Sequence, residues 1–200
     1  MNSDTTLVWT SAPRRTAQIH FPDGRTYEAP VGTPLEHYFR AAIGESEVPF
    51  IAALVNGELR ELSYKMWTDA SVEPLFLSDS DGIRIYRRSL SFLLITVIRE
   101  LFPEAYIFVD HSLPFGGFFC EVGGRKPFDE EELAQIEERM HEIVEKDFSI
   151  RRERVPIDEA LEMFRKRGET DKAKLLARRD REYIKLYNLR DSRDYFHGYM

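Results

Sequence analysis

The sequence predicts an α+β protein with two domains, and three observations lead to this prediction. Residues 17–87 alternate short strand-like runs with one helical segment. Residues 88–200 contain longer helical segments that frame a hairpin. A chain of 200 residues accommodates one large domain or two small ones, and its hydrophobic content of 42% is enough for a core. Residues 1–16 are polar and are expected to form an N-terminal tail or, at most, an added β-strand.

The first domain is predicted to contain a hairpin, a helix and then further strands. The alternating residues 18–21 and 26–29 flank a Pro-Asp-Gly turn, which is typical of a β-hairpin. A capping box of Thr33 and Glu36, with Pro34 at the first helical position, predicts a helix that runs to about Ile43. Further strands are expected at 50–55, 58–62, 72–77 and 83–86. A mixed sheet with the helix across one face fits this order, which is the β-grasp or ubiquitin-like architecture.

The second domain is predicted to begin with a buried helix over residues 90–102, which are apolar on most sides. The clearest helix of the chain starts after Asp129, because Glu132 completes a capping box with it. Its predicted apolar face consists of Leu133, Ile136, Met140, Ile143 and Val144. The other expected elements are a hairpin of 107–109 with 118–122, helices at 157–166 and 170–178, and a strand at 183–189.

Composition and charge restrict the function classes. The single cysteine, Cys120, rules out an intrachain disulfide, and it is expected to be a small buried residue in a strand. No signal peptide is recognisable, and the apolar run at 90–98 is shorter than the ~20 residues that a membrane span needs. We therefore expect a cytoplasmic protein without a membrane partner. The net charge of −7 argues against strong non-specific binding to nucleic acid.

Charge is nevertheless distributed unevenly along the second domain. Residues 129–147 include nine acidic and two basic residues, a net charge of −7. Residues 165–185 include nine basic and four acidic residues, a net charge of +5. Such segments are most simply explained if each faces solvent or if the acidic and the basic segment dock on each other. The alternative is that the basic segment contacts a phosphate-bearing ligand.

Several motifs that would identify an enzyme are absent from the sequence. There is no Walker-type G-x-x-x-x-G-K-[ST] loop, no G-x-G-x-x-G, no cysteine pair, no H-E-x-x-H and no G-x-S-x-G. The five histidines are scattered, so no metal site and no nucleophile–base pair follows from spacing. We expect no catalytic residues, no metal and no cofactor in this chain.

Four short segments of the first domain resemble a TGS domain, the β-grasp unit at the front of threonyl-tRNA synthetases. They lie at residues 19–24 (IHFPDG), 31–35 (VGTPL), 52–57 (AALVNG) and 81–89 (DGIRIYRRS). This resemblance places the TGS domain at 17–87.

Residues 88–200 resemble the second additional domain of threonyl- and alanyl-tRNA synthetases. The matching segments are 101–103 (LFP), 117–121 (GFFCE), 128–140, 158–164 and 194–198. In the synthetases this domain removes mischarged amino acid from tRNA with a His-x-x-x-His pair on the apolar helix and with a Cys and a His in the closing segment. Here Arg88 and Phe92 replace the two histidines, and Phe196 and Met200 replace the Cys and the last His. None of these four side chains activates water, so the resemblance implies an editing site that has been lost.

The whole of residues 17–200 also resembles the front half of bacterial uridine kinase-like proteins. The segments 109–122 and 194–200 carry this resemblance. It implies a P-loop kinase domain after Met200, outside this chain, and ATP and Mg are expected only for that domain. The leading hypothesis is thus a non-catalytic ligand-recognition or regulatory module of a nucleoside kinase, and the alternative is an RNA-binding module for a tRNA acceptor end. A residual hydrolase that uses His111, Cys120 or His197 is the least favoured hypothesis.

The resemblance to the synthetase domain implies that a ligand pocket, if one is kept, lies between the apolar helix and the closing segment. Its expected polar lining is Arg88, Ser89, His111, Asp194 and His197. Arg88 is suited to hold a phosphate or carboxylate, because its guanidinium forms two parallel hydrogen bonds with such groups. The partners expected on this basis are a nucleoside or nucleotide, or an RNA.

Overall fold

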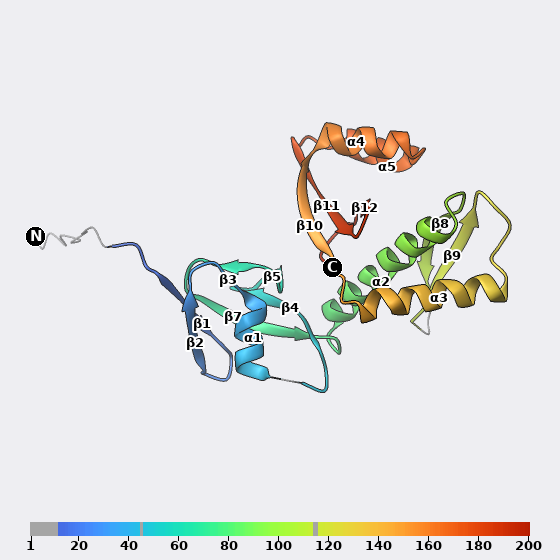
Figure 1. Cartoon of the computed structure of the whole chain (residues 1–200). Helices are drawn as coiled ribbons and strands as arrows, with labels where there is room; N and C mark the ends of the chain where they lie inside the picture. Colours follow the sequence, from blue (N-terminus) through green and yellow to red (C-terminus); the bar gives the residue numbers. More distant parts are fainter. Residues whose placement is uncertain (1–11, 45, 114–115) are drawn as a thin grey trace, which may run out of the picture. The chain divides into compact units, whose positions relative to one another are not determined.

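The computed structural model describes residues 12–44, 46–113 and 116–200, without the side chains of His111 and Ser112. The chain divides into two compact units, one that ends at Arg84 and one from Ile85 to Met200 (Figure 1). Residues 1–11 of the predicted tail lie outside the described residues. No helix within the described ranges combines the length and the apolar character that a membrane crossing requires.

The first unit is built on a five-stranded mixed sheet with the order β2-β1-β7-β4-β5. Its members are β1 (Thr16–His20), β2 (Thr26–Pro30), β4 (Phe50–Val55), β5 (Glu58–Glu61) and β7 (Ala70–Phe76). The central strands β1 and β7 run parallel, and the other pairs are antiparallel. A short pair, β3 (Thr33–Pro34) with β6 (Lys65–Met66), lies outside this sheet. The mixed sheet predicted for this part of the chain is therefore present.

Helix α1 (Leu35–Ile43) packs its apolar face on this sheet (Figure 1). Leu35 and Phe39 are fully buried beside Ile19 of β1 and Ala53 of β4. Burial of one such large side chain contributes roughly 1.5–3 kcal/mol, so this single layer of contacts supplies most of the core of a small unit. The i, i+4 spacing of the two helical residues explains why both point to the same face.

The capping box predicted for α1 is wrong. Thr33 belongs to β3, and its hydroxyl donates to the Pro30 carbonyl oxygen at 2.7 Å instead of capping the helix. Glu36 pairs with Arg40 one turn later. The first amides of the helix, Leu35 and Glu36, donate to backbone carbonyl oxygens of residues 64 and 62 at 3.0 Å each. Tertiary contacts therefore satisfy the helix start, and a side-chain cap is not needed.

The strand predicted at 83–86 is also wrong, because these residues lie in helix α2 (Ser80–Leu101). The predicted Ser80-Asp81-Gly82 turn is the first turn of that helix, and the Ile83 amide donates to the Asp79 carbonyl oxygen at 2.9 Å. The alternation of Ile83 and Ile85 suggests a strand, but the buried residues of this segment, Gly82 and Ile85, follow a helical spacing. A Cβ at Gly82 would collide with the Phe76 carbonyl oxygen, so the tight approach of the helix to β7 requires glycine.

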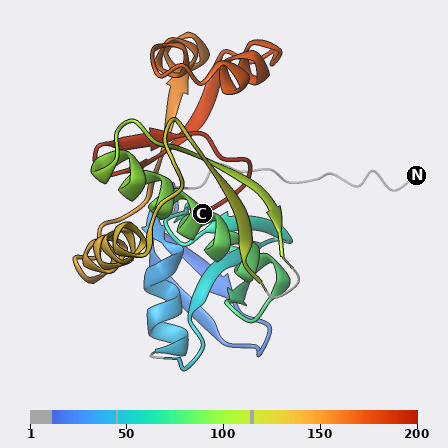
Figure 2. The same cartoon turned by 90° about the vertical axis from the view of Figure 1, so that its right-hand side faces the viewer.

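The second unit combines α2 with a hairpin, three further helices and a small sheet (Figure 2). The hairpin is β8 (Tyr106–Ser112) with β9 (Phe118–Gly123). The helices are α3 (Glu130–Glu145), α4 (Ile157–Lys166) and α5 (Thr170–Ala177). The antiparallel sheet has the order β10-β11-β12, formed by Arg151–Pro156, Tyr183–Leu189 and Ser192–Asp194. The sequence analysis missed β10 and β12, since an arginine-rich run and a three-residue strand have no clear alternation.

Two hydrophobic clusters hold the second unit together, and β11 contributes to both. Tyr187 and Leu189 join α2, α3 and β8, whereas Ile184 and Leu186 join α4, α5 and β10. Ile136 and Ile143 of α3 are buried as predicted, but Leu133 and Val144 are 52% and 61% exposed. The buried stripe of α3 is therefore narrower than its sequence suggests, and the α+β class is confirmed with these corrections.

The predicted capping box of α3 is confirmed. The Asp129 carboxylate accepts from the Glu132 amide at 3.0 Å, and the Glu132 carboxylate accepts from the Asp129 amide at 3.1 Å.

We expect Asp129→Ala to lower the free energy of unfolding of the second unit by about 1 kcal/mol, since the Glu132 amide at the start of α3 loses its acceptor. Urea unfolding followed by far-UV circular dichroism measures this change. Glu131→Ala, which removes an acid from the same turn without removing a cap, is the control, and equal losses in both variants would contradict the capping role.

Candidate functional site

The closing segment of the chain lies against the N-terminal half of α2. Arg88 Nη1 donates a hydrogen bond to the Tyr199 carbonyl oxygen. Gly198 has a φ of +103°, and a Cβ there would lie 2.9 Å from Arg88 Cζ. The Tyr187 hydroxyl donates to the Gly198 carbonyl oxygen at 2.9 Å. The guanidinium that the sequence assigned to an anion therefore holds the backbone of the chain's own last residues.

Apolar side chains fill the positions next to Arg88. Phe92 is fully buried, and its ring lies 5.4 Å from that of Phe196 at an interplanar angle of 59°. Met200 packs against the same hydrophobic cluster. Two aromatic rings and a thioether have no group that takes up or delivers a proton at neutral pH.

The predicted lining residues do not all lie at Arg88, since Asp194 lies against another part of α2. Ser89 Oγ donates to the Ile85 carbonyl oxygen of its own helix at 3.1 Å, and His197 is exposed. Asp194 lies with Arg99, eleven residues along α2, which corresponds to roughly 16 Å at 1.5 Å per residue. The side chain of His111 lies outside the described residues.

Asp194 is fully buried and is the centre of an ion cluster. Its carboxylate accepts from Arg99 Nη2 at 2.9 Å, from Lys172 Nζ at 2.7 and 2.9 Å, and from the Tyr195 amide at 2.7 Å. Glu169 is the second anion of the cluster and lies 2.9 Å from Arg99 Nη2 and 2.7 Å from Lys172 Nζ. The cluster connects α2, α5 and β12, three elements that are far apart in the sequence.

Sequence analysis named Asp194 but missed its partners. A signal was available for Arg99, which is a lone cation between Leu90 and Phe102 in an otherwise apolar helix. Lys172 was counted only as one charge of the basic segment. Its pairing with Glu169, three residues earlier, is a local contact that was not predicted. The two partners of Asp194, Arg99 and Lys172, become neighbours only through the tertiary fold.

A second group of charges lies on the outer face of β10 and β11. Arg154 and Lys185 are directly opposite each other in the register, and both are exposed. Arg154 Cζ lies 4.1 Å from the centre of the Tyr183 ring, which is 42% exposed. Among the described residues, Arg154 and Lys185 have no acidic partner. We call Arg154, Tyr183 and Lys185 the β10–β11 basic patch.

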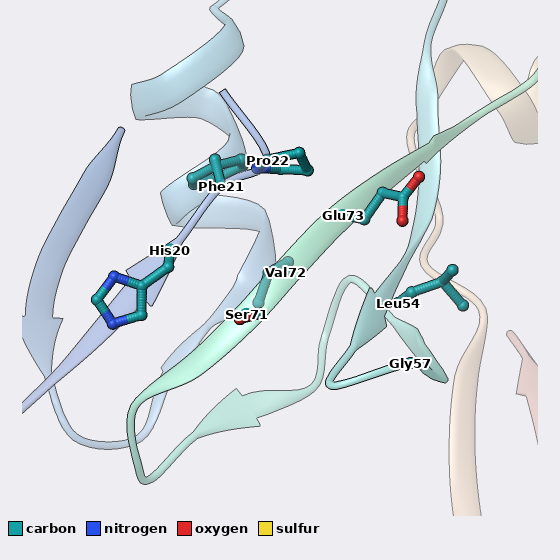
Figure 3. A pocket seen from close by; sticks show the side chains of 8 residues that line it. All are labelled: His20, Phe21, Pro22, Leu54, Gly57, Ser71, Val72 and Glu73. Atoms are coloured by element: carbon teal, nitrogen blue, oxygen red, sulfur yellow. The ribbon is translucent and has the colours of Figure 1, made fainter. Parts of the chain in front are cut away.

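A shallow pocket of about 200 Å³ lies in the first unit, near the end of β1 and the start of β7 (Figure 3). His20 and Glu73 are its ionisable lining residues. The His20 ring is turned towards β2, where its Nδ1 lies 3.0 Å from the Thr26 hydroxyl. The two groups therefore do not act together on a molecule in the pocket.

Cys120 lies in β9 and is partly buried. Burial raises the pKa of its thiol above the ordinary value. Within residues 12–44, 46–113 and 116–200, no three His, Cys, Asp or Glu side chains are arranged to hold a metal ion.

No family model matches the chain. The chain is similar to threonine–tRNA ligases. It is 34% identical to the enzyme of Laribacter hongkongensis over 161 residues, which are 79% of this chain and 25% of that protein. It is 33% identical to the enzyme of Rhodospirillum rubrum over 161 residues and 30% identical to that of Desulforamulus reducens over 159 residues, with coverages of 79% and 80% of this chain.

The chain spans about a quarter of the length of the curated relatives it matches. The comparison supports the resemblance to threonyl-tRNA synthetases that the sequence segments suggested. None of these relatives is a nucleoside kinase, so the comparison gives the uridine kinase interpretation no support.

We expect Asp194→Asn to destabilise the second unit strongly. The substitution removes the fully buried charge that Arg99 and Lys172 compensate. These two side chains are partly exposed and keep Glu169 as a partner, so we expect a loss of about 1.5–3 kcal/mol, the contribution of hydrogen bonds to a charged group. Urea unfolding by circular dichroism measures the loss. Asp191→Asn, an exposed neighbour, is the control and is expected to change the stability by less than about 0.5 kcal/mol. Similar effects of both substitutions would contradict the role of the cluster.

The raised pKa of Cys120 predicts an unreactive thiol at neutral pH. The reaction with a disulfide reagent at pH 7 is expected to be slower in the folded protein than in the urea-unfolded protein, because only the thiolate reacts. The rate should increase as the pH is raised. A folded-state rate at pH 7 equal to or above that of the unfolded chain would identify an activated nucleophile and would revive the hydrolase hypothesis.

Proposed function

We propose that this chain is a module of the threonyl-tRNA synthetase type that binds RNA at a tRNA acceptor end and does not hydrolyse mischarged tRNA. The similarity to threonine–tRNA ligases over about four-fifths of the chain carries this proposal. It favours the RNA-binding hypothesis over the nucleoside kinase hypothesis, which stays a prediction from the sequence alone.

The first unit fits a β-grasp TGS domain, and we propose this identity for it. Support comes from the order β2-β1-β7-β4-β5, from the parallel central pair of β1 and β7, and from α1 packed on the sheet. We propose domain limits of 17–87 and 88–200. The division of the structure at Arg84 is close to this boundary and falls in the first turns of α2.

The loss of hydrolysis follows from the side chains around Arg88. Hydrolysis of an ester needs a base or a metal to activate water. The positions that the synthetase resemblance assigns to histidine and cysteine hold Arg88, Phe92, Phe196 and Met200, and these groups pack on one another and on the closing backbone. The module therefore retains a fold related to editing without the chemistry of editing.

The β10–β11 basic patch is the surface that we propose to contact RNA. Two like charges directly opposite each other on neighbouring strands destabilise a sheet, so Arg154 and Lys185 cost stability unless an anion lies between them. Exposed Tyr183 adds a ring on which a base can stack. Cations next to an exposed aromatic ring are the usual composition of a surface for single-stranded nucleic acid.

Fluorescence anisotropy with a labelled acceptor-stem RNA tests the proposal. We expect affinity that falls with increasing salt, because each neutralised phosphate releases a counterion. The double substitution Arg154→Gln and Lys185→Gln should weaken binding about ten-fold and reduce the salt slope by about 1.5. Lys126→Gln with Lys146→Gln removes the same charge beside the acidic helix α3 and is the matched control.

A deacylation assay on mischarged threonine tRNA completes the test. Release of the amino acid at the rate seen without protein is expected. Salt-independent binding, or equal loss of affinity in both double variants, would contradict the RNA surface, and accelerated release would contradict the loss of editing.

A further inference from the structure

The second unit contains a cavity of about 1140 Å³ at the C-terminal half of α2. Its walls are α2 from Ile95 to Glu100, the start of β8, the loop from α4 into α5, and the turn between β11 and β12. Arg88 does not line it. The cavity is therefore separate from the positions that the synthetase resemblance assigned to editing.

Beneath the surface of one wall of the cavity lie polar atoms without partners. Thr96 is 4% exposed, and its Oγ1 makes no hydrogen bond with a described residue. Arg99 Nη1 is also shielded from solvent and unpartnered within the described chain, although Nη2 of the same guanidinium binds Glu169 and Asp194. Thr96 and Arg99 are three residues apart on a helix, so they lie on the same face. A buried hydroxyl and a buried cationic N–H that bind nothing cost free energy, which a ligand with acceptor atoms would recover.

The charge of this wall favours an anion. Arg99, Arg167 and Lys172 line the cavity. The two carboxylates among them are the partly buried Glu169 and the fully buried Asp194, so this group of five side chains carries one net positive charge. Burial lowers the pKa of Arg167, and the positive charge of Arg99 lowers it further.

The acidic residues at the rim do not reverse this balance. Glu100 binds Arg139 and Arg190 at 2.6 and 2.7 Å, and Glu104 lies 3.3 Å from Arg125. Asp171 lies 4.0 Å from Lys174, and Asp191 is exposed at the turn. These carboxylates are thus paired with cations at the rim or solvated, whereas the unpartnered groups lie inside.

The opposite wall is aromatic. Tyr106 and Phe108 alternate with Ile107 on β8, and Ile107 packs on the core of the unit. The two rings line the cavity, are 54% and 53% exposed, and form an edge-to-face pair with centroids 5.3 Å apart. Two half-exposed rings on a concave wall offer a flat ligand a surface to stack on.

We propose that this cavity binds a small organic anion that carries a flat ring. Rotation of the Thr96 and Arg99 side chains towards the cavity lets Thr96 Oγ1 and Arg99 Nη1 bind the phosphate or carboxylate group, and the ring stacks on Tyr106 or Phe108. The proposal does not rest on the RNA-binding function, because it uses neither Arg154 nor Lys185.

Isothermal titration with the full chain tests this proposal. The probes are uridine and adenosine monophosphates for the phosphate source and benzoate for the carboxylate source. Uridine and adenosine have the ring without the anion, and inorganic phosphate has the anion without the ring. At least one ring-bearing anion is expected to bind at least ten-fold more tightly than the uncharged nucleosides and than phosphate.

Two substitutions locate the site. Thr96→Val removes the hydroxyl and keeps the shape, so the protein should fold normally while the ring-bearing anion binds about ten-fold more weakly. Phe108→Ala should weaken binding about five-fold or more. Ser91→Ala, whose hydroxyl bonds to the Arg87 carbonyl oxygen of the same helix, and Phe118→Ala, on the partner strand β9, are the matched controls.

The outcomes separate clearly. Binding of a ring-bearing anion that is weakened by Thr96→Val and Phe108→Ala but not by the controls supports the proposal. Absence of binding for every ring-bearing anion overturns it, as does binding that both substitutions leave unchanged. If the nucleosides bind as tightly as their monophosphates, the phosphate contributes nothing to binding and the proposed anion site is wrong. The double variant Arg154→Gln with Lys185→Gln is expected to bind RNA more weakly and to bind the ring-bearing anion as tightly as the wild-type protein, so the two proposals are tested separately.

Discussion

The second unit depends on the burial of one carboxylate. Asp194 has no solvent contact, and transfer of an isolated charge to such a site is prohibitively costly. Arg99 of α2 and Lys172 of α5 must therefore approach it, and this requirement fixes the relation of three elements that no short-range signal connects. The two hydrophobic clusters alone would allow the elements to slide, because apolar contacts have little directional preference. The cluster of charges adds direction, as hydrogen bonds to a carboxylate have defined geometry.

One face of α2 serves two different environments. Arg88, Phe92, Thr96 and Arg99 follow one another at spacings of four, four and three residues, so they form a single stripe along the helix. The backbone of the closing segment covers the first part of the stripe, at Arg88 and Phe92. The second part borders the cavity, at Thr96 and Arg99. Because the closing segment covers Arg88 and Phe92, the part of the stripe at Thr96 and Arg99 is the polar part that borders the cavity.

Local patterns predicted local structure well, as two elements illustrate. The capping box of Asp129 and Glu132 is a contact between residues three apart, and the strand at 183–189 has the predicted limits. Prediction failed where tertiary contacts decide. Thr33 has the sequence of an N-cap, but pairing with Met66 places it in a strand, and Ile83 alternates like a strand residue within a helix that starts at Ser80. The candidate site shows the same limit, since nothing in the sequence indicates that Arg99 meets Asp194 across 95 residues or that Thr96 stays unpartnered.

The net charge of −7 does not argue against a local anion site or an RNA surface. Charges in water act over a screening length of about 8 Å at physiological ionic strength, so a bound phosphate responds to its immediate neighbours. The segment 129–147 alone carries a net charge of −7, which equals that of the whole chain, so the remaining residues are neutral in sum. Within this neutral remainder, Arg154 and Lys185 face solvent without an acidic partner among the described residues, and the partly buried Arg99 has an Nη1 group that makes no hydrogen bond there. The distribution of charge, rather than its sum, therefore determines which anions this protein can bind.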